Sequence, residues 1–288
     1  MALYDKEHQI NKLLHGFCEF DLSIGRAEAY MYDGEYHGLM TVRNEVEEYL
    51  SRGVFINNVL VGPFVFSVSG RKISEIVMNF GSKTQGVLYE YHNNGQLRSR
   101  TDMQMGVKHG SRSLYNEAGV LVGKGQLRNG EFHGLVQIWT DQGILLQEQL
   151  YDDGKLHGSS VTYFRNTNVP HFVHMYHKGD KNGVQLDFYR NGLMKTRRHY
   201  VNGVVHGPFC EWHDNGAISE RGVFVSGRLD GFVESWRRSG QLIHRVFYTQ
   251  DCKGWNTSSD KIQEAPDTMD KETLKRKREH PFAEDESY

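Results

Sequence analysis

The stretch GPFCEWHDNGAISERGVFVSG, from Gly207 to Gly227, decides the fold. Residues 209–212 are rich in aromatic and apolar side chains and predict one strand, and residues 217–225 predict a returning strand. Between them, residues 213–216 (His-Asp-Asn-Gly) predict a tight turn, because Asn-Gly readily supplies the positive φ angles that a hairpin turn needs. The stretch therefore predicts one β-hairpin.

This hairpin is one copy of a repeat of about 24 residues. Its period is marked by anchor glycines, several of which follow a histidine: Gly16, Gly38, Gly62, Gly86, Gly110, Gly134, Gly158, Gly183, Gly207, Gly231 and Gly254. A second turn, G-x-x-(H/D)-G, leads to the next unit. We expect two of its five positions to have φ > 0 or to lie close to a neighbouring backbone.

Other positions keep the same phase. Five residues after the anchor, the later units carry an aromatic residue: Tyr91, Tyr115, Trp139, Tyr163, Phe188, Trp212 and Trp236. A lone hairpin is not stable in water, so each unit must be covered by its neighbours. We therefore expect these aromatics to form a packed inner face rather than a platform on which bases stack.

The sequence predicts an all-β fold, an elongated single-sheet solenoid of stacked hairpins about 100 Å long. The array is expected to span residues 15–255 in about eleven units, of which those within 15–81 are degenerate. The Gly158 unit has one extra residue, replaces the Asn-Gly turn with residues 165–168 (Arg-Asn-Thr-Asn) and continues into Pro170. Because proline cannot donate to a ladder, this predicts an edge position or a bulge.

Different structures are expected at the two ends. Residues 1–14 predict an N-terminal cap with a short helix, because Ile10, Leu13, Leu14 and Phe17 have helical spacing. Residues 256–288 predict a disordered polar tail with a short helix at 268–279.

Composition limits the function classes. The chain has 288 residues, a formal net charge of −2 and a pI of about 6.7, which gives no electrostatic case for binding nucleic acid. Its three cysteines form no CxxC pair, which argues against a disulfide framework or zinc cluster and predicts a reducing, cytoplasmic location. We find no secretory signal and no apolar stretch near the roughly 18 residues that span a bilayer.

The consensus G-x-x-H-G-x-x-x-x-(W/Y)-x-x-N-G-x-L resembles the MORN repeat. It is most similar to the 24-residue variant of YwqK-like bacterial proteins and of arrays in large DNA viruses. The resemblance is carried by KHGSRSLYNEAGVL (108–121), FHGLVQIWTDQGIL (132–145) and VHGPFCEWHDNGAI (205–218). It implies a hairpin ribbon that binds proteins and, in some members, phospholipids. Some YwqK-like members are labelled antitoxins.

No catalytic constellation is apparent. The chain lacks GxSxG, GxxxxGK[ST] and HExxH motifs, so we predict that it is not an enzyme and has no cofactor. The anchor histidines suggest a metal ladder, but equivalent residues should lie roughly 10 Å apart, whereas Zn²⁺ needs nitrogen ligands at about 2.1 Å. A role within the turns is therefore predicted for His15, His37, His109, His133, His157 and His206. Cys210 is predicted to be a small core residue.

Two sets of residues are candidates for recognition. Phe164, Phe172 and Tyr189 are aromatics that break the phase of the repeat, and we predict that they are exposed and bind a partner. The tail carries a basic run that resembles a nuclear-import signal and makes a nuclear location the alternative: Lys275, Arg276, Lys277 and Arg278.

The leading functional prediction is a non-catalytic scaffold that binds a protein partner. The alternatives are a peripheral membrane protein that binds acidic lipid headgroups and a YwqK-like antitoxin that neutralises a toxin protein. Self-association is a further expectation. Residues 1–255 hold 28 basic and 27 acidic side chains, a balance that gives the lipid alternative little support.

Overall fold

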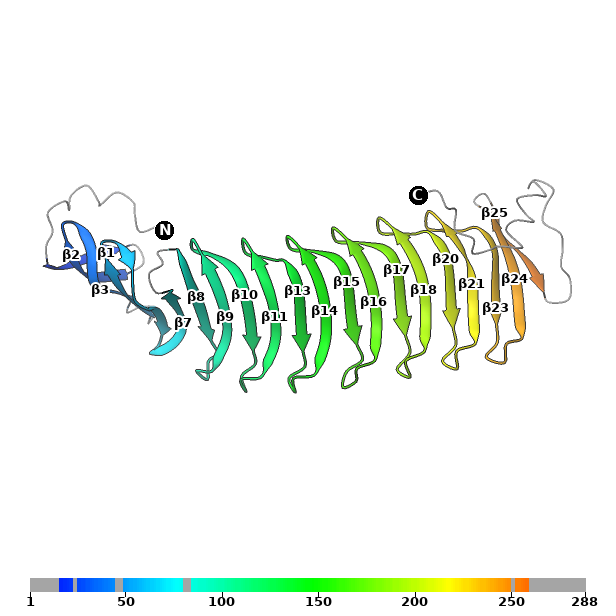
Figure 1. Cartoon of the computed structure of the whole chain (residues 1–288), viewed down its shortest axis with the longest axis horizontal. Coiled ribbons are helices and arrows are strands. Elements are labelled where there is room, and N and C mark those ends of the chain that lie inside the picture. Colours follow the sequence, from blue (N-terminus) through cyan, green and yellow to red (C-terminus); the bar gives the residue numbers. More distant parts are fainter. Residues whose placement is uncertain (1–15, 23–24, 45–48, 80–83, 250–251, 259–288) are drawn as a thin grey trace. The chain divides into compact units, whose positions relative to one another are not determined.

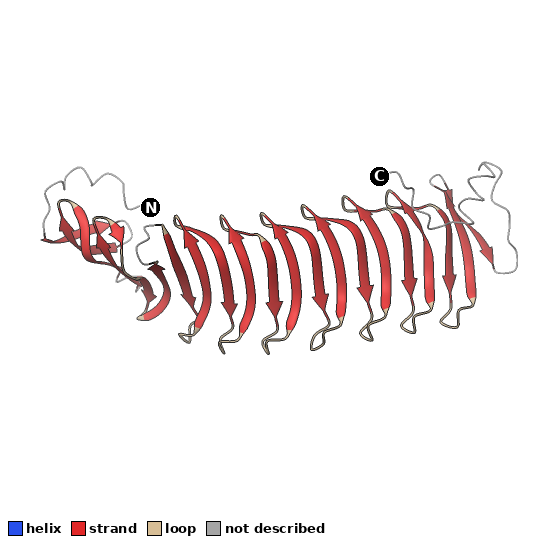
Figure 2. Ribbon diagram, in the orientation of Figure 1, coloured by secondary structure: helices blue, strands red, loops and turns tan. Residues whose placement is uncertain are grey.

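The chain contains strands and turns, and no helix, wherever the structure describes it (Figure 2). The structure is a computed structural model that describes residues 16–22, 25–44, 49–79, 84–249 and 252–258. The predicted all-β class is confirmed. The helices predicted within residues 1–14 and at 268–279 lie outside the described residues, as does the basic run at 275–278. No helix long and apolar enough to cross a membrane occurs in the described part of the chain.

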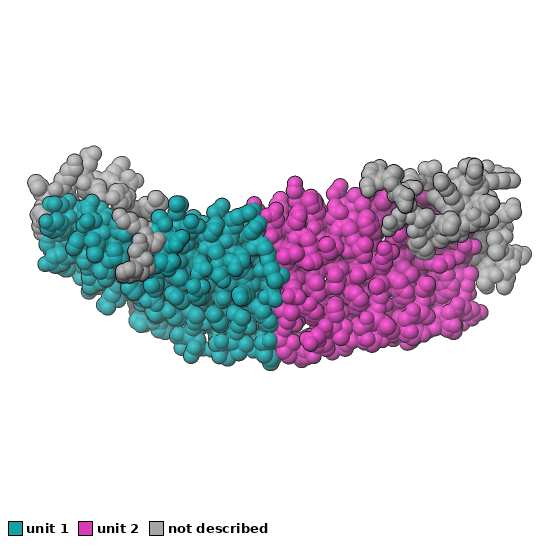
Figure 3. All heavy atoms as spheres, viewed as in Figure 1, with its two compact units in different colours: residues 1–143 teal, residues 144–288 magenta. Residues whose placement is uncertain are grey.

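The chain divides into two compact units, residues 1–143 and 144–288 (Figure 3). The strands of the first unit are β1 (Gly16–Leu22), β2 (Gly25–Tyr32), β3 (Glu35–Asn44), β4 (Tyr49–Ile56), β5 (Val59–Leu60), β6 (Phe64–Val68), β7 (Arg71–Met78), β8 (Gln85–Tyr91), β9 (Leu97–Gln104), β10 (Val107–Tyr115), β11 (Leu121–Arg128), β12 (Glu131–Phe132) and β13 (Gly134–Trp139). These strands pair antiparallel along the chain, and the short strands β5 and β12 share the partners β4 and β11 with β6 and β13 (Figure 1).

The second unit continues the same antiparallel pattern. Its strands are β14 (Leu145–Asp152), β15 (Lys155–Tyr163), β16 (Pro170–His177), β17 (Asp180–Phe188), β18 (Met194–Val201), β19 (Val204–Val205), β20 (Gly207–Trp212), β21 (Ile218–Val225), β22 (Arg228–Leu229), β23 (Gly231–Trp236), β24 (Leu242–Thr249) and β25 (Cys252–Ser258). The last strand extends past residue 255, where we expected the array to end.

The turn that follows β20 needs only one left-handed residue. Gly216 has φ 84°, whereas Asn215 is not among the residues with positive φ. The amide of Gly216 donates to the carbonyl of His213 at 2.9 Å, and the amide of His213 donates to the carbonyl of Ala217 at 2.8 Å. The prediction that Asn-Gly supplies two positive φ angles here is therefore wrong. Instead, the side-chain oxygen of Asn215 accepts from the amide of Ala217 at 3.1 Å and holds the turn from within.

The turn at the opposite end of the strands does use two adjacent left-handed residues. Ser226 and Gly227 have φ 49° and 84° and join β21 to β22, the pattern of a two-residue hairpin turn. Gly231, the next anchor, has φ 83° and lies where the ladder is interrupted between β22 and β23. Both glycines of the G-x-x-(H/D)-G turn thus have φ > 0, as predicted, and the anchor forms a bulge.

Side chains at the turn between β20 and β21, and at its equivalents in neighbouring hairpins, donate hydrogen bonds to the corresponding turn of the next hairpin. The hydroxyl of Tyr189 donates to the carbonyl of Trp212 at 2.7 Å, and Nε2 of His213 donates to the carbonyl of Trp236 at 2.8 Å. The side-chain amide nitrogen of Asn215 likewise donates to the backbone carbonyl of Arg238 at 3.0 Å. Each bond joins residues 23 apart in the sequence. These bonds hold successive hairpins in one register.

Burial in each sheet follows position along the strand more than residue type. The aromatics expected on a packed inner face are only half-buried from Tyr91 to Trp236. The most buried side chains include Thr101, 0% exposed, and Gln185, 3% exposed, as well as Phe209 and Val233. In the first unit, the buried core is the cluster formed by Ala27, Ala29, Met31, Met40 and Val42.

The left-handed turns generate a stability prediction. Met105 has φ 51° and is 75% exposed, so its side chain contributes little packing to offset a conformation that costs most L-residues about 1–2 kcal/mol. Sister turns place Asn129 and Asn202 at this position. We expect Met105→Asn to raise the free energy of unfolding by about 0.5–1 kcal/mol in urea titrations followed by circular dichroism. Met105→Leu is the control and should change little; equal stabilities of the two variants would contradict the prediction.

Candidate functional site

The irregular turn in the second unit brings aromatic side chains together. The amide of Phe164 donates to the carbonyl of Val169 at 3.0 Å, and Asn166 has φ 63° within the turn. Pro170 pairs with Tyr163, and the register shifts at this point, so His171 is an extra residue that bulges from β16. Because β16 pairs with both β15 and β17, Pro170 does not lie on a sheet edge. Of the two predicted alternatives, the bulge is the correct one.

The bulge inserts the ring of His171 between two aromatic rings that the sequence had singled out. The ring centres of Phe164 and His171 are 4.1 Å apart, and those of His171 and Phe172 are 3.7 Å apart. The interplanar angles are 24° and 27°, so the three rings are stacked. Phe164, Phe172 and Tyr189 are half-buried rather than exposed as predicted, because they pack on one another and on neighbouring strands.

Two cations complete the site, which we call the aromatic–histidine cluster: Phe164, His171, Phe172 and Tyr189, with Arg190 and Lys195. The guanidinium carbon of Arg190 lies 5.5 Å from the ring centre of Phe164, and the ammonium nitrogen of Lys195 lies 5.8 Å from that of Tyr189. Both cations are exposed, and neither forms an ion pair with a carboxylate in the described part of the chain.

Some other arginines of the second unit have carboxylate partners. The guanidinium of Arg221 donates to Glu234 at 2.8 Å, and that of Arg245 donates to the same carboxylate group at 2.9 Å. Arg198 pairs with Glu211. The cluster is therefore a place where positive charge remains available beside aromatic rings.

The one carboxylate close to the cluster is already bound. Nε2 of His174 donates to Oδ1 of Asp187 at 2.9 Å, and the hydroxyl of Thr196 donates to Oδ2 at 2.8 Å. Burial alone favours the protonated form of Asp187, but these two hydrogen bonds, together with the charge interactions with His174 and Lys181, outweigh it and lower its pKa. The bond to Asp187 thus fixes the orientation of the His174 ring. The centre of this ring lies 5.4 Å from that of Phe172.

His171 is the residue that sequence reasoning missed. Burial of its ring lowers its pKa; the nearby Asp187 carboxylate opposes this shift, whereas Lys195 and His174 add to it. The ring is therefore neutral at pH 7. The same one-residue bulge recurs in other units, at Lys195 between β17 and β18 and at Ser219 between β20 and β21, so it is a regular feature of the array. What distinguishes the Gly158 unit is that its bulged residue is a histidine, which stacks between Phe164 and Phe172.

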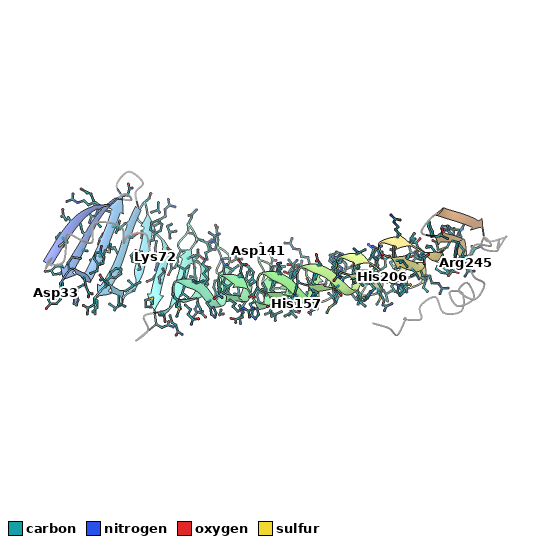
Figure 4. All side chains as sticks on the ribbon, turned by 90° about the horizontal axis from the view of Figure 1, so that it is seen from above. Asp33, Lys72, Asp141, His157, His206 and Arg245 are labelled. Carbon is teal, nitrogen blue, oxygen red and sulfur yellow. The ribbon has the colours of Figure 1, made fainter. Side chains whose placement is uncertain are left out.

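The anchor histidines serve the turns. Nδ1 of His206 accepts a hydrogen bond from the amide of Ser226 at 3.2 Å, and Nδ1 of His109 accepts one from the amide of Asn129 at 3.4 Å. His157, labelled with His206 in Figure 4, packs against His177 with ring centres 4.8 Å apart. The predicted turn role is confirmed for His206 and His109, although the bond reaches the turn of the following hairpin.

Cys210 lies in a setting that favours the thiol over the thiolate. Its side chain is half-buried in β20, and burial raises the pKa of the thiol despite the nearby cations Arg221 and Arg197. The thiol is therefore protonated at neutral pH, in agreement with its predicted packing role.

The stacked histidine generates a pH prediction. Because the pKa of His171 is lowered in the folded protein, the unfolded chain binds more protons below about pH 6.5, and stability falls as the pH falls through that range. His171→Phe keeps an aromatic ring in the stack but cannot take up a proton. We expect wild-type protein to lose more free energy of unfolding than this variant between pH 7.5 and pH 5.5 in urea titrations. Equal losses in both proteins would show that His171 does not carry this dependence.

The comparisons with known proteins identify the repeat. Residues 84–104 match the family model described as MORN repeat variant, a stretch that contains the hairpin of β8 and β9. A search of curated proteins returns no significant match to the chain. MORN repeats are a non-enzymatic repeat type and are generally linked to protein or membrane interactions. The likeness to YwqK-like proteins stays a prediction.

Proposed function

The chain is a MORN-repeat protein, and we propose that it is a non-catalytic scaffold that binds an acidic segment of a partner protein at the aromatic–histidine cluster. The observation that carries this proposal is the placement of two cations, Arg190 and Lys195, over half-buried aromatic rings, with no carboxylate paired to either among the described residues. Aromatic residues and arginine are enriched where proteins bind one another. Carboxylates of a partner would give these two cations the charge pairing that Arg198, Arg221 and Arg245 already have.

The cluster is held in place before a partner arrives. The hydroxyl of Tyr189 is bound to the carbonyl of Trp212, and the stack of Phe164, His171 and Phe172 is fixed by the bulge in β16. A preorganised site loses less side-chain entropy on binding than a mobile one. The rings therefore supply a fixed apolar surface, and the cations supply charge at its margin.

Acidic lipid headgroups are the second candidate ligand, because the same two cations would attract them. A protein partner is favoured since the array as a whole has nearly equal numbers of basic and acidic side chains, so the unpaired charge is local. A local site with aromatic rings suits a short peptide segment better than an extended anionic surface.

Charge reversal tests the proposal. The full chain is used to capture proteins from native extract beside the double variant Arg190→Glu/Lys195→Glu. We expect a partner captured at near-equal stoichiometry by wild type to bind the variant at least tenfold more weakly, because two cations that faced its carboxylates have become anions. Arg228→Glu is the matched control: Arg228 is an exposed arginine in β22, away from the cluster, and its reversal should leave capture unchanged.

The outcomes separate the candidate functions. Equal weakening by the control would mean that net charge rather than the cluster matters. Capture unaffected by any of these changes would contradict the proposed site. Binding of vesicles that contain phosphatidylserine, lost in the double variant and with no protein captured, would favour the membrane function. Capture of a small toxin would instead support the antitoxin alternative.

A further inference from the structure

Two histidine rings lie in contact on neighbouring strands of the second unit. His157 in β15 and His177, the last residue of β16, have ring centres 4.8 Å apart and ring planes tilted by 52°. The antiparallel register pairs Gly158 with Tyr176, so His157 and His177 stand opposite each other one position further along. His177 is exposed, so solvent and small ions can reach the pair.

Stacking of the hairpins does not require this pair. In the next two hairpins, the position of His177 holds valine, and the position of His157 holds asparagine in one and histidine in the other: Asn182 with Val201, and His206 with Val225. These positions are equivalent because each lies next to the pair that the anchor glycine forms in the ladder. The two contacting histidines are therefore an addition to the repeat rather than a part of it.

The imidazole of His157 lacks the hydrogen bond that His206 makes to the following turn. Nδ1 of His206 accepts from the amide of Ser226 at 3.2 Å, and the corresponding amide for His157 belongs to Lys178. Nδ1 of His157 is nevertheless buried and has no hydrogen-bond partner in the described part of the chain. A buried nitrogen without a partner is unfavourable, and an ordered water molecule or an ion commonly satisfies such an atom.

The separation of the two rings matches that of imidazoles bound to one metal ion. Zn²⁺ binds an imidazole nitrogen at about 2.1 Å, and the ring centre lies about 1.1 Å beyond that nitrogen, so two rings at a tetrahedral angle have centres about 5 Å apart. The 4.8 Å between the rings of His157 and His177 is close to this distance. Successive anchor histidines stand roughly 10 Å apart and cannot share an ion, whereas His177 stands on the strand next to that of His157.

The atoms of the pair indicate which kind of ion it can hold. Imidazole nitrogens favour Zn²⁺, Ni²⁺ and Cu²⁺, whereas Mg²⁺ and Ca²⁺ prefer oxygen ligands. Asp180 pairs with His177 across β16 and β17, so its carboxylate adds negative charge on the adjacent strand. Asp180 is exposed and forms no ion pair within the portion of the chain that the structure describes. The surroundings of the two histidines therefore suit a divalent cation that is bound through nitrogen.

We propose that His157 and His177 bind one divalent transition-metal ion, such as Zn²⁺, and that water molecules complete its coordination. The ion joins β15 to β16 at the end of these strands opposite to the turn that carries Phe164, so the site is separate from the aromatic–histidine cluster. It takes the place of the bond to the following turn that His157 does not make. Because unfolding separates the two ligands, the bound ion stabilises the folded chain.

Zinc titration of the full chain tests the site. Isothermal titration calorimetry with ZnCl₂ compares wild type with His157→Asn and His177→Val, which introduce residues of neighbouring hairpins and should leave the circular dichroism of the sheet unchanged. We expect either change to weaken the binding of one Zn²⁺ per chain at least tenfold, because a single imidazole remains. His206→Asn is the matched control: it replaces an anchor histidine that stands opposite Val225 and should leave zinc binding at the wild-type level.

Nitrogen-15 NMR of the histidine rings identifies the ligands. Zn²⁺ should shift the signals of two rings in wild type, and each is assigned because it is missing from the spectrum of the corresponding variant. In His177→Val, the ring signals of His157 should stay unchanged at the same zinc concentration. The proposal is overturned if both variants bind zinc as wild type does, if His206→Asn weakens binding as much as they do, or if zinc leaves the rings of His157 and His177 unshifted.

Discussion

The hydrogen bonds from one turn to the next are the interaction on which the regular part of this protein depends. A single hairpin cannot bury enough surface to be stable in water, so its register relative to its neighbours must be fixed from outside the hairpin. Tyr189, His213 and Asn215 provide this by donating to carbonyl groups 23 residues further along. Because each acceptor is a backbone carbonyl, the position requires only a donor of suitable length. Tyrosine and histidine can therefore stand at the same place in different units without a change of fold.

Recognition, in contrast, is expected where this regularity is interrupted. The turn between β15 and β16 lacks the Asn-Gly pair, and the bulge beside it, which recurs in other units, here carries His171 and stacks three rings. This surface is built from substitutions that the backbone ladder tolerates. The ladder thus supplies a constant support for it.

The spacing of the glycines was enough to predict the hairpins and the MORN-repeat character, since most of the anchor and turn glycines have positive φ angles that other residues reach only with strain. The backbone conformation of Asn215 could not be predicted from sequence. Asparagine is favoured both where its side chain accepts a bond from a nearby amide and where the backbone is left-handed. The burial of Thr101 and Gln185 was also unpredictable, since it depends on their position in the middle of a strand rather than on their polarity. For the candidate site, Phe164, Phe172 and Tyr189 were singled out as aromatics outside the regular aromatic position, although Tyr189 stands at the same turn position as His213. His171 could not be singled out without the register of β16, which tertiary pairing decides.

The anchor glycine bulges have a consequence for how such a chain can change its length. Each regular unit brings its own anchor-glycine bulge and both of its turns. In the described turn-to-turn bonds, its residues contact only the adjacent units. Duplication of one 24-residue segment would therefore create one new junction with the same backbone geometry as existing ones, and deletion would rejoin matching ends. Evolution can then lengthen or shorten such an array in steps of about 10 Å, one hairpin at a time, without redesigning a site built within one hairpin pair.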